Sequence, residues 1–197
     1  TGAHVAGPGG CSMIRSVLFS IAVIVSATPA AAADWKMEAG TSRLEFAATY
    51  ERTAAPGVFK EFDTRLHFDA DKPTEGRLDV TIVITSADMS SADVNKAIGA
   101  AEWFDFAKFP RAEFHATEIR RTAAGRYLAR GQLSLKGVQQ AVEVPFIWAE
   151  TGDTAKMDGE FVVKRNPFSI GTGEWASTSV IGADVTIKFS VRLRKVG

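Results

Sequence analysis

Cysteine is almost absent from this sequence. Its 197 residues include one cysteine, Cys11, which precedes the part of the chain that we expect to fold. A disulfide framework needs cysteines in pairs and a thiolate metal site needs several, so both are excluded. Core packing must therefore hold the folded part together, and a chain of this length can bury a sufficient core.

The chain also lacks an excess of charge of either sign. It has 23 basic and 23 acidic side chains and a formal net charge of +0. Nucleic acids and anionic membrane surfaces attract proteins that have a basic excess, so the composition favours neither partner. We expect no nucleic acid among the partners.

The longest apolar run is too short to cross a membrane. Val17–Ala27 falls well short of the roughly 20 apolar residues that a transmembrane helix needs. It follows the basic residue Arg15 and precedes the small residues Ala30–Ala33, an arrangement that predicts a secretory signal peptide over residues 13–33. We therefore expect no stable insertion in a membrane.

The signal peptide sets the organisation of the chain. Cleavage near Ala33 would release residues 34–197 as one domain, in the periplasm or outside the cell. Residues 1–12 precede Met13, the first candidate start, and have no periodicity. We interpret them as an upstream extension or a cloning remnant.

Motifs for catalysis are missing as well. Ser169-Ile170-Gly171 lacks the glycine two residues before the serine that a nucleophile elbow requires. Gly171-Thr172-Gly173 is not followed by the lysine of a phosphate loop. The separation of two glycosidase carboxylates cannot be read from a sequence. We predict no catalytic residues and no enzyme, with a lipid hydrolase as an alternative.

Histidine is scarce, with three in the chain. His4 lies in the leader, and His67 and His115 each occupy the polar phase of an expected strand. No third ligand follows at a recognisable metal spacing, so we interpret both as surface residues and expect no metal site.

What the sequence does have is a period of two. In Gly131–Phe146, apolar and polar side chains alternate before and after Gly137, which predicts two strands joined by a tight turn. The apolar phase recurs in runs at Leu44–Tyr50, Gly57–Phe68, Leu78–Ile84, Glu113–Arg121, Tyr127–Leu135, Ala141–Trp148, Met157–Val163 and Val185–Leu193.

About eight strands with short connections predict an all-β antiparallel meander. Closing the sheet into an extended up-and-down β-barrel, as in lipocalins, removes exposed strand edges. We prefer this barrel to a two-sheet sandwich, which usually has shorter strands and longer crossings. The apolar face would then become either a packed core or a cavity.

One segment breaks the alternation. From Asp88 to Phe106 the apolar period is helical, with Val94 and Ile98 on one stripe and Ser90 or Ser91 as the N-cap. The sequence therefore predicts one short helical insertion, which carries a dense group of aromatic residues.

With the strands placed, residues 35–193 resemble the YceI-like family of exported lipocalin-like proteins. The matching pieces are Ser42–Phe46, Gly57–Phe62, Trp103–Asp105, Phe109-Pro110, Glu113-Phe114, Gly131–Val138, Arg165–Gly171 and Val185–Leu193. The sequence departs from the family pattern at Asn166-Pro167, where an acidic residue or serine is expected before the phenylalanine.

The resemblance implies an apolar tunnel that holds a long isoprenoid, such as a polyprenyl chain or the tail of a quinone. It implies no catalytic residues and no cofactor other than a bound isoprenoid lipid or isoprenoid quinone. It also implies export to the periplasm or secretion, and it allows a homodimer.

Large apolar side chains in the inward phase are the candidate ligand contacts. Such residues are usually core, but small residues in the same phase (Ala48, Ala116, Ala129 and Gly159) would leave dry gaps for an apolar guest. The candidates are Phe46, Ala48, Phe62, Phe68, Ile82, Ile84, Ile98, Trp103, Phe104, Phe114, Phe146, Phe161, Phe168, Trp175 and Phe189. An indole N–H of Trp103 or Trp175 could reach a ligand head group.

The first hypothesis is therefore an exported protein that binds an isoprenoid-type lipid for transport, storage or sequestration. The second is a scavenger of other amphiphiles or hydrophobic toxic compounds in a stress response. The third is the lipid hydrolase, and the fourth is a structural module with a solid core.

Overall fold

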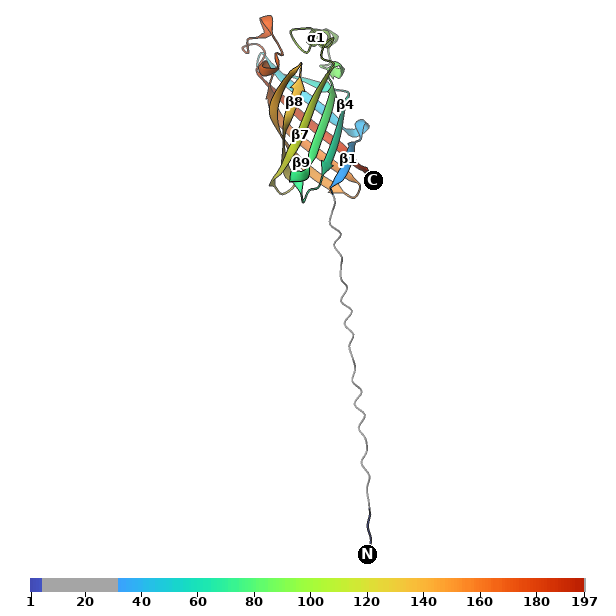
Figure 1. Cartoon of the computed structure of the whole chain (residues 1–197). Helices are drawn as coiled ribbons and strands as arrows, with labels where there is room; N and C mark the ends of the chain where they lie inside the picture. The colour runs from blue at the N-terminus through green and yellow to red at the C-terminus, as the bar shows by residue number, and fades with distance from the viewer. Residues whose placement is uncertain (5–31, 197) are drawn as a thin grey trace.

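A computed structural model describes residues 1–4 and 32–196, and residues 33–196 contain one continuous sheet with a short helix at one end (Figure 1). Apart from Ala32 and Ala33, the predicted signal peptide lies outside the described residues. The strands are β1 (Ala33–Met37), β2 (Arg43–Tyr50), β3 (Thr53–Phe59), β4 (Phe62–Phe68), β5 (Arg77–Val83), β6 (Ala87–Asp88), β7 (Arg111–Ala123), β8 (Arg126–Leu135), β9 (Val138–Thr151), β10 (Thr154–Lys164) and β11 (Asp184–Val196). The helix is α1 (Ala92–Ile98), and the short 3-10 turns are η1 (Ala39–Thr41), η2 (Pro73–Glu75), η3 (Ile84–Ser86), η4 (Asn166–Phe168) and η5 (Gly173–Trp175).

The sheet closes into a barrel. The pairing order β1-β4-β5-β7-β8-β9-β10-β11 returns to its start because β1 also pairs with β11, and every pairing is antiparallel. This circuit confirms the predicted eight-strand antiparallel barrel with one short helix. Its closure satisfies the backbone edges that an open meander would expose.

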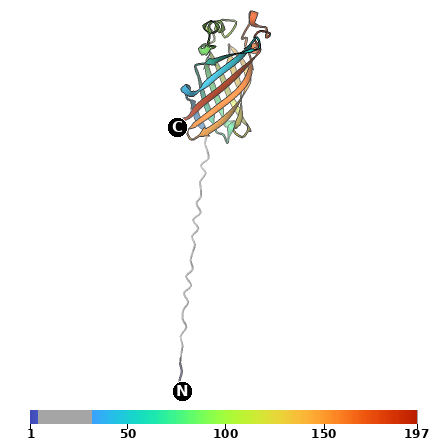
Figure 2. The same ribbon diagram turned by 180° about the vertical axis from the view of Figure 1, so that it is seen from behind.

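Three short strands extend this circuit toward the end that carries α1. β11 pairs with β1 near its own C-terminus and with β2 over Thr186–Ser190, so β1 and β2 lie end to end along the same neighbour. Figure 2 shows β11 in dark red between the blue β2 and the orange β10. β3 pairs with β2 and β6 pairs with β3, which continues the wall of the barrel beyond β4 and β5.

The predicted single strand Gly57–Phe68 is wrong in one respect, because the chain breaks at Lys60 and Glu61 into β3 and β4. The Glu61 N–H donates to the Ser86 hydroxyl at 3.0 Å, and the Lys60 N–H donates to the Ser86 carbonyl at 3.3 Å. A side chain thus takes a hydrogen bond that a continuous ladder would have used, which the alternation of apolar residues does not report.

Helix α1 begins as the sequence predicts, with Ser91 as its N-cap accepting the Val94 N–H at 3.4 Å. The Asp88 carboxylate fixes the preceding turn, accepting from the Ser90 N–H at 2.9 Å and the Asn95 amide at 2.8 Å. Lys60 lies 2.6 Å from the same carboxylate. These hydrogen bonds and the Lys60 ammonium hold the pKa of the Asp88 carboxyl well below its usual range.

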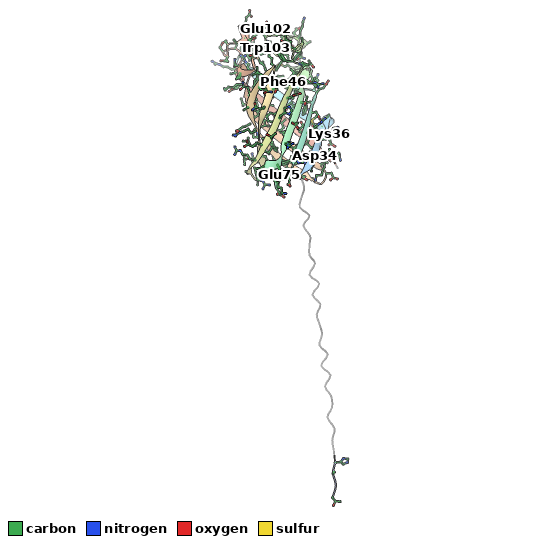
Figure 3. The ribbon with its side chains drawn as sticks, in the orientation of Figure 1. Asp34, Lys36, Phe46, Glu75, Glu102 and Trp103 are labelled. Carbon is green, nitrogen blue, oxygen red and sulfur yellow. The ribbon has the colours of Figure 1, made fainter. Side chains whose placement is uncertain are left out.

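Aromatic side chains fill the opposite end of the barrel. Trp35 packs edge-on against Trp148 with ring centroids 5.1 Å apart, and Phe68 lies 5.2 Å from Trp148 and 5.0 Å from Tyr127. Phe146 stacks on Tyr127 at 5.4 Å. These five residues, which we call the base, lie at the end where Asp34 and Glu75 are seen in Figure 3, and they close that end with the protein's own side chains.

Candidate functional site

Above the base, the barrel encloses an apolar cavity of about 740 Å³. Its walls are inward-facing side chains of the strands, and its mouth lies among α1 and the loops at the end where Glu102 and Trp103 are labelled in Figure 3. Thr64, Ser90, Asp93 and Arg165 are the polar residues among its lining, besides the polar tips of Tyr50, Trp103 and Trp175. The cavity is therefore a carbon-lined pocket that ends blindly at the base.

The structure brings all but two of the candidate ligand contacts to this cavity. Those that line it are Phe46, Ala48, Phe62, Ile82, Ile84, Ile98, Trp103, Phe104, Phe114, Phe161, Phe168, Trp175 and Phe189. They come from β2, β4, β5, β7, β10 and β11, from η3, from α1 and its following loop, and from the segment after Arg165.

Phe68 and Phe146 do not line the cavity, so their expected place is corrected. Both are inward-facing and almost fully buried, at 2% and 3% exposure, but they belong to the base. The period of two separates the inside of a barrel from its outside and does not encode height along the barrel axis.

The small residues that were expected to leave gaps lie in different surroundings. Ala48 lines the cavity, whereas Ala116 and Ala129 are fully buried outside it. The space beside Gly159 is filled, because a Cβ there would lie 2.3 Å from the Phe189 ring. Gly57 supports the Phe46 ring in the same way. Two glycines thus let aromatic rings lie flat against the cavity wall.

Sequence reasoning missed several aliphatic wall residues. They are Leu44, Leu78, Val80, Leu133, Leu135, Val142, Val144, Val163, Val185, Ile187 and Val191. All share the inward phase of their strands, so the alternation of apolar and polar residues already indicated them as wall residues. They were missed because the prediction considered mainly aromatic residues.

Arg165 organises the loop on one side of the mouth. Arg165 is almost fully buried, with 3% exposure. Its guanidinium donates hydrogen bonds of 2.8–3.1 Å to six backbone carbonyls, those of Ile170, Gly171, Trp175, Ser177, Ile181 and Gly182. Burial lowers the pKa of this guanidinium from its ordinary value. A guanidinium has five N–H donors, so these six hydrogen bonds occupy all of them. Arg165 therefore shapes the loop at the mouth and offers no free donor to a ligand.

A second contact ties this loop to the loop after α1. The Lys136 ammonium donates to the Ala101 and Ser169 carbonyls, both at 2.7 Å. The Glu102 carbonyl accepts the N–H groups of Gly171 at 2.8 Å and Thr172 at 3.0 Å. We call residues 99–109 and 165–183, joined in this way, the rim.

Two tryptophans meet where the two halves of the rim touch. The Trp103 and Trp175 rings lie 5.7 Å apart, and the Arg165 guanidinium lies 6.0 Å from the centre of the Trp103 ring. Both indoles also line the cavity.

His67 and His115 lie on the outer wall, as predicted. His67 Nδ1 is 2.7 Å from Asp34 Oδ1, and His115 Nδ1 is 2.7 Å from Asp79 Oδ1. The hydrogen bond that His115 donates to the Asp79 carboxylate raises the pKa of His115 above its usual value. Within residues 1–4 and 32–196, no cluster of three or more histidine, cysteine or carboxylate side chains could hold a metal ion.

None of the helices in residues 1–4 and 32–196 has the length and apolar character needed to span a membrane.

Comparison with known proteins gives a consistent assignment. The family model of the YceI-like domain matches residues 35–193. The crystal structure of BcnA from Burkholderia cenocepacia is 31% identical, with a TM-score of 0.77 over 79% of this chain and 98% of that chain. A polyisoprenoid binding domain from Saccharophagus degradans has a TM-score of 0.67 over 82% of this chain, and its 14% identity shows the fold alone.

Curated relatives match over shorter stretches. A UPF0312 protein of Photorhabdus laumondii is 36% identical over 86 residues, which is 44% of this chain and 44% of the relative. Protein YceI of Salmonella arizonae is 31% identical over 122 residues, 63% of that relative's length. The chain thus spans about half the length of the curated relatives it matches.

Proposed function

The chain belongs to the YceI-like family, and we propose that it binds one long isoprenoid-type lipid, a polyprenyl chain or a quinone tail, inside the barrel cavity. In this proposal the protein is exported and carries, stores or sequesters the lipid without covalent chemistry. The polyisoprenoid binding domain of Saccharophagus degradans, which has the same fold, supports the choice of ligand class.

The observation that carries the proposal is the blind cavity lined almost entirely by carbon. Water in such a space finds few partners, so an apolar guest replaces it favourably. Each buried CH₂ contributes about 0.8 kcal/mol, so a branched hydrocarbon chain can bind well with few polar contacts.

The composition of the lining favours binding over catalysis. Among the residues that border the cavity there is no histidine, cysteine or lysine. Thr64 and Ser90 are hydroxyl-bearing candidates for a nucleophile, but no hydrogen bond joins either side-chain hydroxyl to a histidine or a carboxylate among the described residues; Ser90 contacts the Asp88 carboxylate through its backbone N–H. A hydrolase would need such an activated nucleophile near the substrate.

Mass analysis of the ligand tests the proposal. The protein is purified from its natural host without detergent, and an organic extract and a native mass spectrum are recorded. We expect one lipid of isoprenoid mass per chain. A fatty acid, an amide or another amphiphile in its place would favour the scavenger, and a protein without any bound lipid that also fails to take up a quinone would contradict lipid binding.

A pair of tryptophan substitutions locates the site. Ala48→Trp places an indole in the cavity. Ala47→Trp adds the same ring at the adjacent position of β2, and Ala47 does not line the cavity. We expect the first to abolish uptake of an isoprenoid quinone and the second to leave uptake unchanged. Equal uptake by both variants would mean that the ligand lies elsewhere.

Trp103 is proposed as a contact to the head group. Trp103→Ala should weaken retention of a quinone that has a polar ring and leave retention of a saturated hydrocarbon analogue nearly unchanged. Identical retention of both ligands would remove this role.

Export is tested by N-terminal sequencing. We propose cleavage near Ala33, where β1 begins. The protein recovered from the periplasm or the medium should begin within one or two residues of Asp34, and an uncleaved cytoplasmic chain would contradict export.

A further inference from the structure

The seam between β9 and β10 is open over half its length. β10 pairs with β9 only from Thr154↔Thr151 to Asp158↔Ile147. Both strands continue beyond this point, and each is fully paired on its other edge, β9 with β8 to Leu135↔Val138 and β10 with β11 to Lys164↔Asp184. The separation therefore belongs to this seam and is not a general fraying of the barrel end.

The sequence supplies a cause for the separation. Continued in the same register, the ladder would next place Gly159 opposite Phe146 and Glu160 opposite Pro145. Pro145 has no N–H to donate, and a Cβ at Gly159 would lie only 2.4 Å from the Pro145 carbonyl oxygen. The two strands approach closely here, and beyond this residue their edges are no longer joined.

A slit of about 350 Å³ lies at this opening. Gln140–Glu143 of β9 border one side, and Val162–Lys164, Pro167 and Phe168 border the other. Val142, Val163 and Phe168 border both the slit and the central cavity. These three apolar side chains therefore lie between the slit and the cavity.

The charges beside the slit point away from the seam. Glu143 accepts from Arg130 on β8 at 2.6 and 3.0 Å, and Lys164 donates to Asp184 on β11 at 2.8 Å. No ion pair found among the described residues crosses the slit itself. Val162 stands at its outer edge with 57% exposure. The border of the slit is therefore mixed: Gln140, Glu143 and Lys164 are polar, whereas Val142, Val163 and Phe168, which also line the cavity, are apolar.

Contacts also cross part of the mouth at the barrel end. Lys136, Glu102 and the Trp103–Trp175 pair join the two halves of the rim across part of it. An end-on path would require a long chain to thread past this rim into a pocket with no exit at the base. A lateral opening lets the same chain slide in along its length.

From these observations we propose that the isoprenoid chain enters and leaves the cavity sideways, through the slit between β9 and β10, with Phe168 as the side chain that moves aside. This inference rests on the proposed function and adds the route that the ligand takes.

Reversible closure of the slit tests the proposal. In the full chain with Cys11→Ser, Glu143→Cys and Val162→Cys place one thiol on each edge of the slit, and a bismaleimide with a reducible disulfide in its linker joins them. The matched control joins the two halves of the rim through Glu102→Cys and Thr172→Cys. The probe is an isoprenoid quinone in phosphatidylcholine vesicles, and the rate of its transfer to the protein is measured.

We expect the slit link to slow transfer at least tenfold and the rim link to change it less than twofold. Reducing the linker should restore the rate, which separates a blocked route from damage to the fold. Phe168→Ala should accelerate transfer.

Two results would overturn the route. One is unchanged transfer with the slit linked, and the other is transfer blocked by the rim link alone; in both, quinone still binds and the proposed function stands. If the unlinked protein takes up no quinone at all, the proposed function fails first, and the route fails with it.

Discussion

Residues that face the barrel interior divide into two groups with different consequences. Phe68 belongs to the base and is 2% exposed, whereas Phe104 borders the cavity and is half-buried. Removing a fully packed aromatic ring leaves a void, while a ring beside an existing cavity has fewer partners to lose.

This division predicts opposite effects of one substitution at two sites. Phe68→Ala should lower the free energy of unfolding by about 3–5 kcal/mol, and Phe104→Ala by about 1 kcal/mol. Urea unfolding of the ligand-free protein measures both. Quinone binding should respond in the reverse order, and a Phe104→Ala variant that retains full affinity would contradict its place in the site.

Arg165 gives a second test at the same scale. Arg165→Lys keeps the charge but replaces a planar fork with a single ammonium, which cannot reach six carbonyls at once. We expect a loss of about 2–3 kcal/mol in unfolding free energy, since several hydrogen bonds to a charged group are removed together. Arg192→Lys on the outer wall is the control and should cost less than about 0.5 kcal/mol. Equal stabilities would show that the six hydrogen bonds add nothing.

His115 provides a test by titration. Its pKa is raised in the folded state by Asp79, so the stability contributed by this pair is present below the unfolded-state pKa of about 6.5 and is lost as pH rises through the folded value. The side chain is 53% exposed, so screening keeps the effect small. NMR titration should show a pKa above the ordinary value that falls back in Asp79→Asn. A pKa unaffected by that substitution would contradict the pairing.

At the scale of elements, the clearest device is the hairpin turn between β8 and β9. Lys136 and Gly137 both have positive φ, at 49° and 75°, as a two-residue turn between antiparallel strands requires. The glycine was expected at this place from the sequence. The same turn directs the Lys136 side chain to the rim, where burial lowers the pKa of its ammonium.

Removing this ammonium should loosen the rim without affecting the barrel. In Lys136→Met the stem is retained and the two hydrogen bonds to Ala101 and Ser169 are lost. We expect amide hydrogen exchange at Gly171 and Thr172 to accelerate at least tenfold, because local opening there becomes easier. Amides in the β7–β8 ladder should not change, and Lys188→Met serves as the control. Unchanged exchange at the rim would show that the Glu102 carbonyl and Arg165 hold it without Lys136.

The elements also show what a sequence can and cannot predict here. The alternation of apolar and polar residues identified the inner wall of β7 to β11, because each strand has one face toward solvent and one toward the barrel interior. It failed at Glu61, where a serine hydroxyl replaces a ladder partner, and at Phe68 and Phe146, where height in the barrel decides between base and cavity. Height depends on how the strands are staggered, and stagger is a property of pairs of strands.

The open seam is a further example of this limit. Pro145 alone predicts only a weakened ladder, and Gly159 alone predicts a bulge or a close contact. Their effect appears when β9 and β10 lie side by side and the two residues meet at one level. The ladders on either side, β8–β9 and β10–β11, continue past this level, so the opening lies between β9 and β10.

At the scale of the whole molecule, the barrel has one solid half and one hollow half. The base supplies packing that does not depend on a ligand, whereas the walls of the cavity face space that an apolar chain would fill. A ligand that binds only the folded state stabilises it by mass action. The protein should therefore fold without lipid and become more stable with it.

The size of this effect can be predicted. A quinone at a hundredfold excess over its Kd adds about 2.7 kcal/mol to the free energy of unfolding. For a domain of this size each kcal/mol raises Tm by about 2–4 °C, so the expected rise is about 5–10 °C. Calorimetry with and without an isoprenoid quinone measures it, and Ala48→Trp, whose indole would obstruct the cavity, should show a smaller rise. A rise of the same size in that variant would contradict binding of the lipid beside β2 inside the barrel.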